Sequence, residues 1–110
     1  PGKPQIWYLD LFAGKNDHEA VQRAGESGHK EINRTNLSTD QITEGLKKDV
    51  VQKQLALIRM RNTHKAFSEG AEVAISGGER SLEIRWEYNS AFATLYVNFE
   101  SGTYTIVESR

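Results

Sequence analysis

Alternating apolar and polar residues in the last forty positions constrain the fold more than any other feature. Leu82, Ile84, Trp86 and Tyr88 alternate with charged residues, which is the period of a strand with one buried face. Turn signals flank this run, and apolar alternation resumes beyond them. The turns are Gly77-Gly78, Asn89-Ser90 and Glu100-Ser101-Gly102, and the other strands centre on 72–76, 93–99 and 104–106. The pattern predicts an antiparallel β-meander over residues 70–110.

Two helices are predicted upstream of the meander. Ser38 has the residue type of a helix N-cap, and Gln41 three positions later completes a capping box, so one helix should span 39–45. A second should span 49–62, with one apolar stripe and one wet face. The stripe contains Val51, Leu55 and Ile58, and the wet face contains Lys47, Lys48, Lys53, Arg59 and Arg61.

The N-terminal run Gln5–Phe12 is almost continuously apolar. Such a run is typical of a strand covered on both faces, as in parallel sheets and barrels. A single strand cannot satisfy its own backbone groups, so we expect an orphan strand whose partners lie elsewhere. The chain begins with Pro1-Gly2-Lys3-Pro4 rather than Met, which resembles an internal loop. We therefore expect a fragment of a longer enzyme, with a tag or processing scar as the alternative.

Charge and composition exclude several classes of function. The 110 residues carry 14 basic and 15 acidic side chains and no cysteine. They therefore offer no disulfide framework or cysteine metal site, and no electrostatic basis for binding nucleic acid or an anionic membrane. No stretch approaches the roughly 20 apolar residues that span a bilayer, and no signal-peptide pattern is present. We expect a cytoplasmic protein that binds neither nucleic acid nor membranes.

The polar segment 13–36 is the candidate functional loop, because long loops in compact domains are usually functional or mobile. Its centre, His18–Arg23, can form a helical turn. Gly14-Lys15 lacks the first glycine and the Ser/Thr of a phosphate-binding loop. Two further sets of side chains are candidates, namely the histidines His18, His29 and His64 and the carboxylates Asp10, Asp17 and Glu31. The histidines lack metal-ligand spacing, and nothing in the sequence brings the carboxylates together as glycoside chemistry requires.

Asn33-Arg34 is the strongest candidate pair for binding a substrate. Arginine offers a rigid fork of donors that suits a carboxylate or vicinal hydroxyls, and asparagine offers both a donor and an acceptor. From the spacing alone, a loop arginine bound to a backbone carbonyl is the favoured alternative.

At Gly14-Lys15-Asn16-Asp17 and Glu31-Ile32-Asn33-Arg34 the chain resembles the sucrose phosphorylases of the α-amylase-like glycoside hydrolase family 13. The resemblance covers roughly two-thirds of the chain and also includes Pro4-Gln5-Ile6, Val50-Val51 and Arg61-Asn62-Thr63 with Ala66-Phe67. The approach Gly28-His29-Lys30-Glu31 and the position of Asp10 look closer to relatives that act on sucrose 6′-phosphate or glucosylglycerate.

The resemblance implies a placement in a larger fold. Residues 1–69 would end a catalytic (β/α)8 barrel, with Gln5–Phe12 as its last strand and 13–36 as an active-site loop at its C-terminal face. Residues 70–110 would form a C-terminal antiparallel β-domain. In fold class the chain is expected to be α+β, with one orphan barrel strand, two helices and a β-meander.

The resemblance also implies an activity for the parent protein. The family cleaves sucrose or a related α-glucoside with phosphate, retaining configuration, to give α-glucose 1-phosphate. Phosphate is the co-substrate, and no cofactor or metal is implied. The catalytic carboxylates lie on earlier barrel strands, so this fragment should be inactive alone. Arg34 would hold the glucosyl hydroxyls as a substrate-binding residue, and Asn33 would support it.

An autonomous, non-catalytic module that binds carbohydrate or mediates assembly is the alternative. Trp7, Trp86 and Tyr88 could stack on sugars, although aromatic residues at strand spacing are usually core. In either case the orphan apolar surface predicts self-association. The sequence leaves the acceptor open among fructose, fructose 6-phosphate and glycerate.

Overall fold

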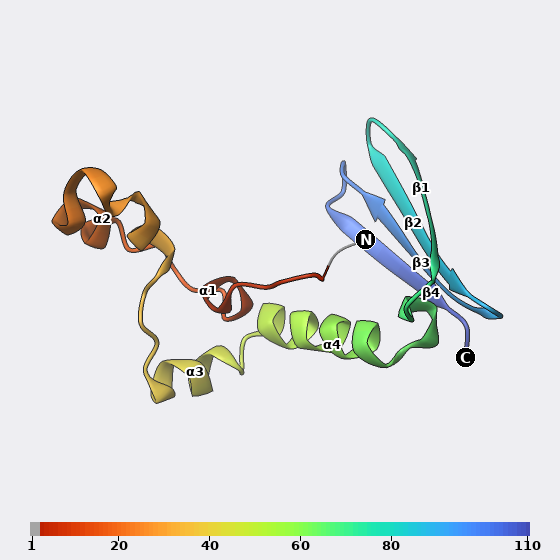
Figure 1. Cartoon of the computed structure of the whole chain (residues 1–110), viewed down its shortest axis with the longest axis horizontal. Coiled ribbons are helices and arrows are strands. Elements are labelled where there is room, and N and C mark those ends of the chain that lie inside the picture. Colours follow the sequence, from red (N-terminus) through yellow and green to blue (C-terminus); the bar gives the residue numbers. More distant parts are fainter. Residues whose placement is uncertain (1–2) are drawn as a thin grey trace. The chain divides into compact units, whose positions relative to one another are not determined.

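The chain divides into two compact units, Pro1–Ile58 and Arg59–Arg110, in a computed structural model that describes residues 3–110 except the side chain of Ser27. The first elements are α1 (Tyr8–Leu11), α2 (His18–Ala24), the 3-10 helix η1 (Gly25–Asn33), α3 (Thr39–Gly45) and α4 (Asp49–Thr63). They are followed by η2 (Lys65–Phe67), β1 (Glu72–Gly78), β2 (Ser81–Tyr88), β3 (Ala91–Asn98) and β4 (Thr103–Glu108), as Figure 1 shows. The predicted α+β class is confirmed. The predicted domain boundary between residues 69 and 70 stays a prediction.

The second unit is built on a four-stranded antiparallel sheet in the order β1-β2-β3-β4. Each strand pairs with its neighbour in sequence, so the predicted meander is confirmed. The first turn lies two residues later than Gly77-Gly78, because Gly78 pairs with Ser81 and the loop is Glu79-Arg80. Gly77 instead admits a close backbone approach, since a Cβ there would overlap the Ser81 carbonyl oxygen.

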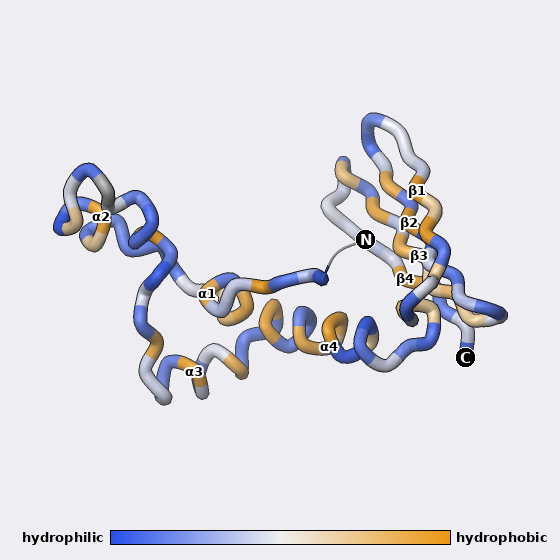
Figure 2. Tube along the Cα trace, in the orientation of Figure 1, coloured by the Kyte–Doolittle hydropathy of each residue, from blue (hydrophilic) through white to orange (hydrophobic). Residues whose placement is uncertain are grey.

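One face of this sheet carries an apolar row that crosses all four strands. Ile75 lies opposite Ile84, Ile84 opposite Leu95, and Leu95 opposite Ile106. Figure 2 shows the alternation of hydrophobic and hydrophilic positions along these strands. The helix η2 packs on the sheet with β2 and β3 as its neighbours, and the Phe67 ring lies 5.2 Å from that of Trp86.

Part of the apolar face stays open to solvent. Ile75 is 69% exposed, Val73 is 53% exposed and Tyr104 is 51% exposed. An open apolar surface of this kind favours association with another surface. Self-association of the chain stays a prediction.

The helices α3 and α4 form where the sequence predicts them. Ser38 Oγ accepts from the Gln41 amide at 3.2 Å, and Gln41 Oε1 accepts from the Ser38 amide at 2.8 Å. This reciprocal pair satisfies two amides that have no partner within the helix. The helix α4 ends at Thr63, one residue beyond the predicted Asn62.

The predicted strand over Gln5–Phe12 is wrong. Residues 3–7 belong to no helix or strand, and Tyr8–Leu11 forms the helical turn α1. Local bonds close this turn, from the Leu11 amide to the Trp7 carbonyl at 3.0 Å and from the Phe12 amide to the Tyr8 carbonyl at 3.2 Å. A short apolar run fits a buried helix as well as a strand. The local bonds satisfy backbone groups that a strand would present to a neighbour.

Side chains from α4 and the residue before it anchor α1 within the first unit. Lys48 Nζ donates to the Phe12 and Ala13 carbonyls at 3.1 and 3.3 Å. Gln54 Nε2 donates to two α1 carbonyls, both at 3.3 Å. Carbonyls at a helix C-terminus have no partner inside the helix, so these donors complete α1. Lys48 is exposed, as expected for the wet face, and its ammonium also bonds to these carbonyls.

Leu9 and Val51 are the buried aliphatic side chains of the first unit. A Cβ at Gly14 would overlap the end of the Leu9 side chain and lie 2.7 Å from Leu9 Cγ. Gly14 therefore admits Leu9 into its buried position. This contact fixes the start of the loop that follows α1.

Candidate functional site

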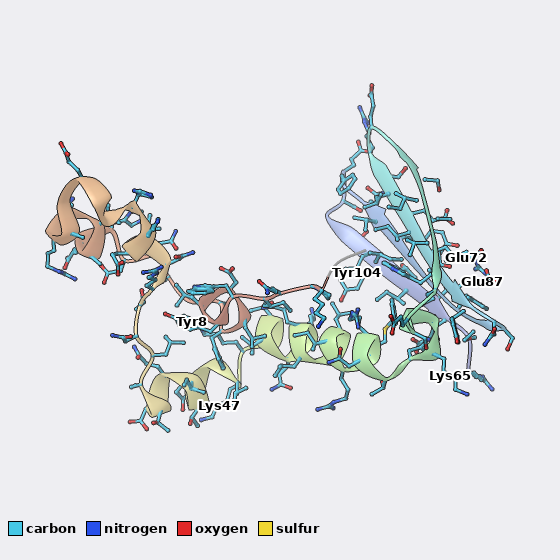
Figure 3. All side chains as sticks on the ribbon, in the orientation of Figure 1. Tyr8, Lys47, Lys65, Glu72, Glu87 and Tyr104 are labelled. Atoms are coloured by element: carbon cyan, nitrogen blue, oxygen red, sulfur yellow. The ribbon has the colours of Figure 1, made fainter. Side chains whose placement is uncertain are left out.

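The candidate loop is attached to α1 on both sides of Arg34. The Trp7 indole Nε1 donates to the Asn33 carbonyl at 2.7 Å, and the Tyr8 hydroxyl donates to the Thr35 carbonyl at 2.9 Å. Figure 3 shows Tyr8 on α1, where the loop begins and returns. Arg34 thus lies between two main-chain carbonyls that are held by aromatic donors.

The neck of the loop is closed by a backbone hydrogen bond. The Asp17 amide donates to the Ile32 carbonyl at 2.7 Å. One step outward, the Thr35 hydroxyl donates to the Lys15 carbonyl at 3.3 Å. These bonds bring the two ends of the segment 17–32 together.

Between these ends the loop folds on itself. Asp17 caps α2 by accepting from the Ala20 amide at 2.9 Å, and its carboxylate lies 3.6 Å from Arg23. Gly25 has a φ of +69°, a conformation that glycine adopts without steric cost. Gly28 is buried, and a Cβ there would lie 2.6 Å from the Val21 carbonyl oxygen. The two glycines allow α2 and η1 to pack closely.

The Arg34 side chain is oriented by one carboxylate and remains half exposed. Its Nη1 lies 3.1 Å from Glu31 Oε1, and 51% of the side chain is accessible. The Arg34 amide also donates to the Glu31 carbonyl at 3.2 Å. A guanidinium has five donor hydrogens, and Glu31 is its one carboxylate partner among the described side chains. Arg34 can therefore donate to hydroxyls of a ligand while it keeps this ion pair.

Comparisons with known proteins identify relatives over the whole chain, although no family model matches it. The sucrose 6(F)-phosphate phosphorylase of Ilumatobacter coccineus is 49% identical over 106 residues, which are 96% of this chain and 20% of that protein. The sucrose phosphorylase of Agrobacterium vitis is 38% identical over 109 residues, which are 99% of this chain and 22% of that protein.

A solved structure agrees with these relatives. The crystal structure of sucrose 6F-phosphate phosphorylase from Thermoanaerobacter thermosaccharolyticum matches with a TM-score of 0.88 and 36% identity, covering 100% of this chain and 22% of that one. This chain belongs with the sucrose phosphorylases. It matches their C-terminal part and spans about a fifth of the length of these relatives.

Within this sucrose phosphorylase part, substrate binding by Arg34 and Asn33 stays a prediction. The structure places both residues at the neck of the loop. Asn33 lies at the end of η1 with an exposed side chain, and its carbonyl is the acceptor for Trp7. Arg34 follows directly, and within the described residues its side chain makes the ion pair with Glu31 rather than a bond to a backbone carbonyl.

The remaining candidates have structural roles or are exposed. Asp17 caps a helix, Asp10 lies exposed on α1, and Lys15 is exposed. His64 Nδ1 accepts from the Ala66 amide at 3.2 Å, and because that position must be unprotonated, Nε2 donates to the Ser109 carbonyl at 2.9 Å. Across residues 3–110, no three His, Cys, Asp or Glu side chains gather as a metal site. In the same range, no helix is both long and apolar enough to cross a membrane.

Sequence reasoning missed the contribution of Trp7 and Tyr8. The apolar run predicts a strand interior for both residues, and the sequence indicates only a core or sugar-stacking role for Trp7. The available signal was that each ring carries a donor that usually finds a partner. Neither the partner carbonyls nor their positions 26 and 27 residues away could be read from periodicity.

Proposed function

We propose that this chain is the C-terminal part of a retaining glucosyl phosphorylase of glycoside hydrolase family 13. The parent would transfer a glucosyl group from sucrose or a related α-glucoside to phosphate and release α-glucose 1-phosphate. The names of the relatives support this activity. The observation that carries the role of this chain is the half-exposed Arg34 guanidinium on a neck held from both sides.

The proposed reaction has two displacements at the anomeric carbon. A carboxylate of the parent attacks that carbon as the bond to the leaving oxygen breaks, and an acid protonates this oxygen. A phosphate oxygen then attacks the same carbon and displaces the carboxylate, while the deprotonated acid takes a proton from the phosphate, so configuration is retained. Phosphate is a co-substrate, and the mechanism needs no further cofactor. The attacking carboxylate and the acid are expected outside these 110 residues.

Arg34 is proposed to hold the transferred sugar. Its planar fork can donate to two adjacent hydroxyls at once, and Glu31 keeps one edge of the fork occupied. The other edge of the guanidinium is then free to donate to the sugar, in a direction set by the ion pair. Asn33 is proposed to support Arg34 in binding the same sugar.

Sucrose 6F-phosphate is the first donor to test, because the relative that is 49% identical carries that substrate in its name. Sucrose is the second donor, since another relative at 38% identity is named for it. Glucosylglycerate is the third. The three share the α-glucosyl group and differ in the acceptor, so Arg34 should matter for all of them.

The test uses the full-length protein that contains this chain, with phosphate and each donor, and measures release of glucose 1-phosphate. We expect Arg34→Ala to lower kcat/KM about 10- to 100-fold, because charge-assisted hydrogen bonds are the strong ones. Arg34→Lys should fall between, since an ammonium keeps the charge but loses the fork. Arg80→Ala is the control, because Arg80 is exposed on the first hairpin and pairs only with Glu100 in the described chain.

Two results would contradict the proposal. One is a full-length protein that releases no glucose 1-phosphate from any of the three donors. The other is release of glucose 1-phosphate by these 110 residues alone, because they should lack the catalytic carboxylates. Sugar binding by the isolated chain, without turnover by the full-length protein, would favour the carbohydrate-binding module instead.

A further inference from the structure

Few side-chain contacts hold Arg34, although its proposed role needs a guanidinium in a defined position. Its one ion pair is with Glu31, three residues earlier, and both side chains are about half exposed. Exposed pairs of this kind contribute little, because solvent screens the charges and both side chains lose rotamer freedom. Glu31 directs the guanidinium but fixes the place of Arg34 only weakly, so that place must depend mainly on where the backbone is held.

Two aromatic side chains hold that backbone, one on each side. Trp7 Nε1 lies 2.7 Å from the carbonyl that precedes Arg34, and Tyr8 Oη lies 2.9 Å from the carbonyl that follows it. The two rings are neighbours, with centroids 5.1 Å apart and planes tilted by 45°. Because Trp7 and Tyr8 are adjacent in sequence, one dipeptide bonds to the carbonyls of the two residues that flank Arg34.

The dipeptide is itself fixed by the packing of α1. Trp7 is the N-cap residue of α1 and Tyr8 is its first residue. The next residue, Leu9, is 2% exposed and packs against Gly14. The far end of α1 is held by Gln54 and by Lys48. The position of Arg34 thus depends, through α1, on buried and hydrogen-bonded residues of the first unit.

We propose that Trp7 and Tyr8 are positioning residues for Arg34, acting through its flanking carbonyls rather than by contact with the sugar. This inference rests on the proposed role of Arg34 as a substrate-holding residue. A small displacement of such a residue has a large effect, because productive binding needs closely defined geometry. The indole N–H and the phenol O–H are therefore specific requirements of the site.

The test is a set of conservative variants in the full-length protein. Tyr8→Phe removes the hydroxyl and Trp7→Phe removes the indole N–H, while both keep an aromatic ring. We expect each to raise KM for the glucosyl donor about two- to tenfold, as loss of one hydrogen bond would, with a smaller change in kcat. Tyr96→Phe is the matched control, because Tyr96 is exposed on β3 in the second unit.

Each variant is then combined with Arg34→Ala. If Trp7 and Tyr8 act through Arg34, Tyr8→Phe changes KM in the wild-type background and leaves it unchanged beside Arg34→Ala. Hydrogen exchange supplies a second readout, since the amides of residues 31–36 should exchange faster in Tyr8→Phe. A structural role alone would change KM equally in both backgrounds.

Failure of this inference differs from failure of the proposed function. A large effect of Arg34→Ala with no effect of Tyr8→Phe and Trp7→Phe would overturn the positioning role and leave Arg34 as a binding residue. Equal effects of Tyr8→Phe with and without Arg34 would also overturn it. If Arg34→Ala itself leaves KM and kcat unchanged, Arg34 does not hold the substrate, and both proposals fail.

Discussion

Each of the two units of the chain is stabilised internally by a different kind of hydrogen bond. In Arg59–Arg110, backbone ladders join each strand to its neighbour in sequence. In Pro1–Ile58, side chains reach main-chain carbonyls far along the chain, from Trp7 to Asn33 over 26 residues and from Gln54 to Asp10 over 44 residues. The first arrangement depends on backbone pairing, and the second depends on the identity of individual side chains.

This difference teaches where substitutions should matter. A ladder survives the loss of one side chain, because its hydrogen bonds belong to the backbone. A side-chain bond to a carbonyl is lost with the side chain and leaves its partner unpaired. The candidate site lies in the unit of the second kind, so its geometry should respond to changes at a distance in sequence.

The largest effect that the comparison predicts is for Leu9→Ala in the first unit. Leu9 is buried against Gly14, and truncating a buried leucine costs about 2–5 kcal/mol. Hydrogen exchange of the 110-residue chain should show lost protection in residues 8–35 and unchanged protection in the sheet. Ile75→Ala is the control, because this residue is 69% exposed and its loss should change stability by less than about 0.5 kcal/mol. Equal loss of protection in both units would contradict the conclusion that the two units respond differently to the loss of one side chain.

His64→Phe tests a ring of the second unit that, like Trp7 and Tyr8 in the first unit, bonds to a main-chain carbonyl far along the chain. The imidazole joins the Ala66 amide to the Ser109 carbonyl, and phenylalanine would leave both without their partner. We expect a loss of about 1–3 kcal/mol in the unfolding free energy of the sheet, measured by urea denaturation. His29→Phe, on an exposed loop position, should have a much smaller effect. An unchanged midpoint for His64→Phe would mean that the ladder alone sustains this unit.

The smallest effect is expected from the charges on β1 and β2. Glu72 lies directly opposite Glu87, both are labelled in Figure 3, and Arg85 pairs with Glu87 on one side. Like charges in opposite positions destabilise a sheet, so Glu72→Lys should stabilise it by about 0.2–1 kcal/mol. The gain should shrink in 1 M salt, which screens exposed charges. A gain that is independent of salt would point to a cause other than charge.

How much of this structure the sequence predicts follows from the same contrast. Alternation at Leu82, Ile84 and Trp86 predicted the meander, because strand pairing between neighbours is a local property. Ser38 and Gln41 predicted the start of α3, since a capping box spans only four residues. The helix α1 was not predicted, because a short apolar run fits a strand or a helix equally well.

The candidate site shows the same limit. A motif pointed to Arg34, and the structure adds its ion pair with Glu31. The hydrogen bonds from Trp7 and Tyr8 could not be predicted, because they join residues 26 and 27 positions apart. Partners at such separations depend on tertiary packing, which no periodicity encodes.

The hydrogen bond between Asp17 and Ile32 closes the segment between them into a separate surface loop. Its own contacts, from the Asp17 cap to the close packing at Gly28, are internal to the segment. The bonds from Trp7 and Tyr8 to the carbonyls of Asn33 and Thr35 lie outside the neck. Within the segment, Glu31 is the residue that bonds to Arg34. Substitutions within this segment, other than at Glu31, can therefore change the surface that it presents while Arg34 keeps its place.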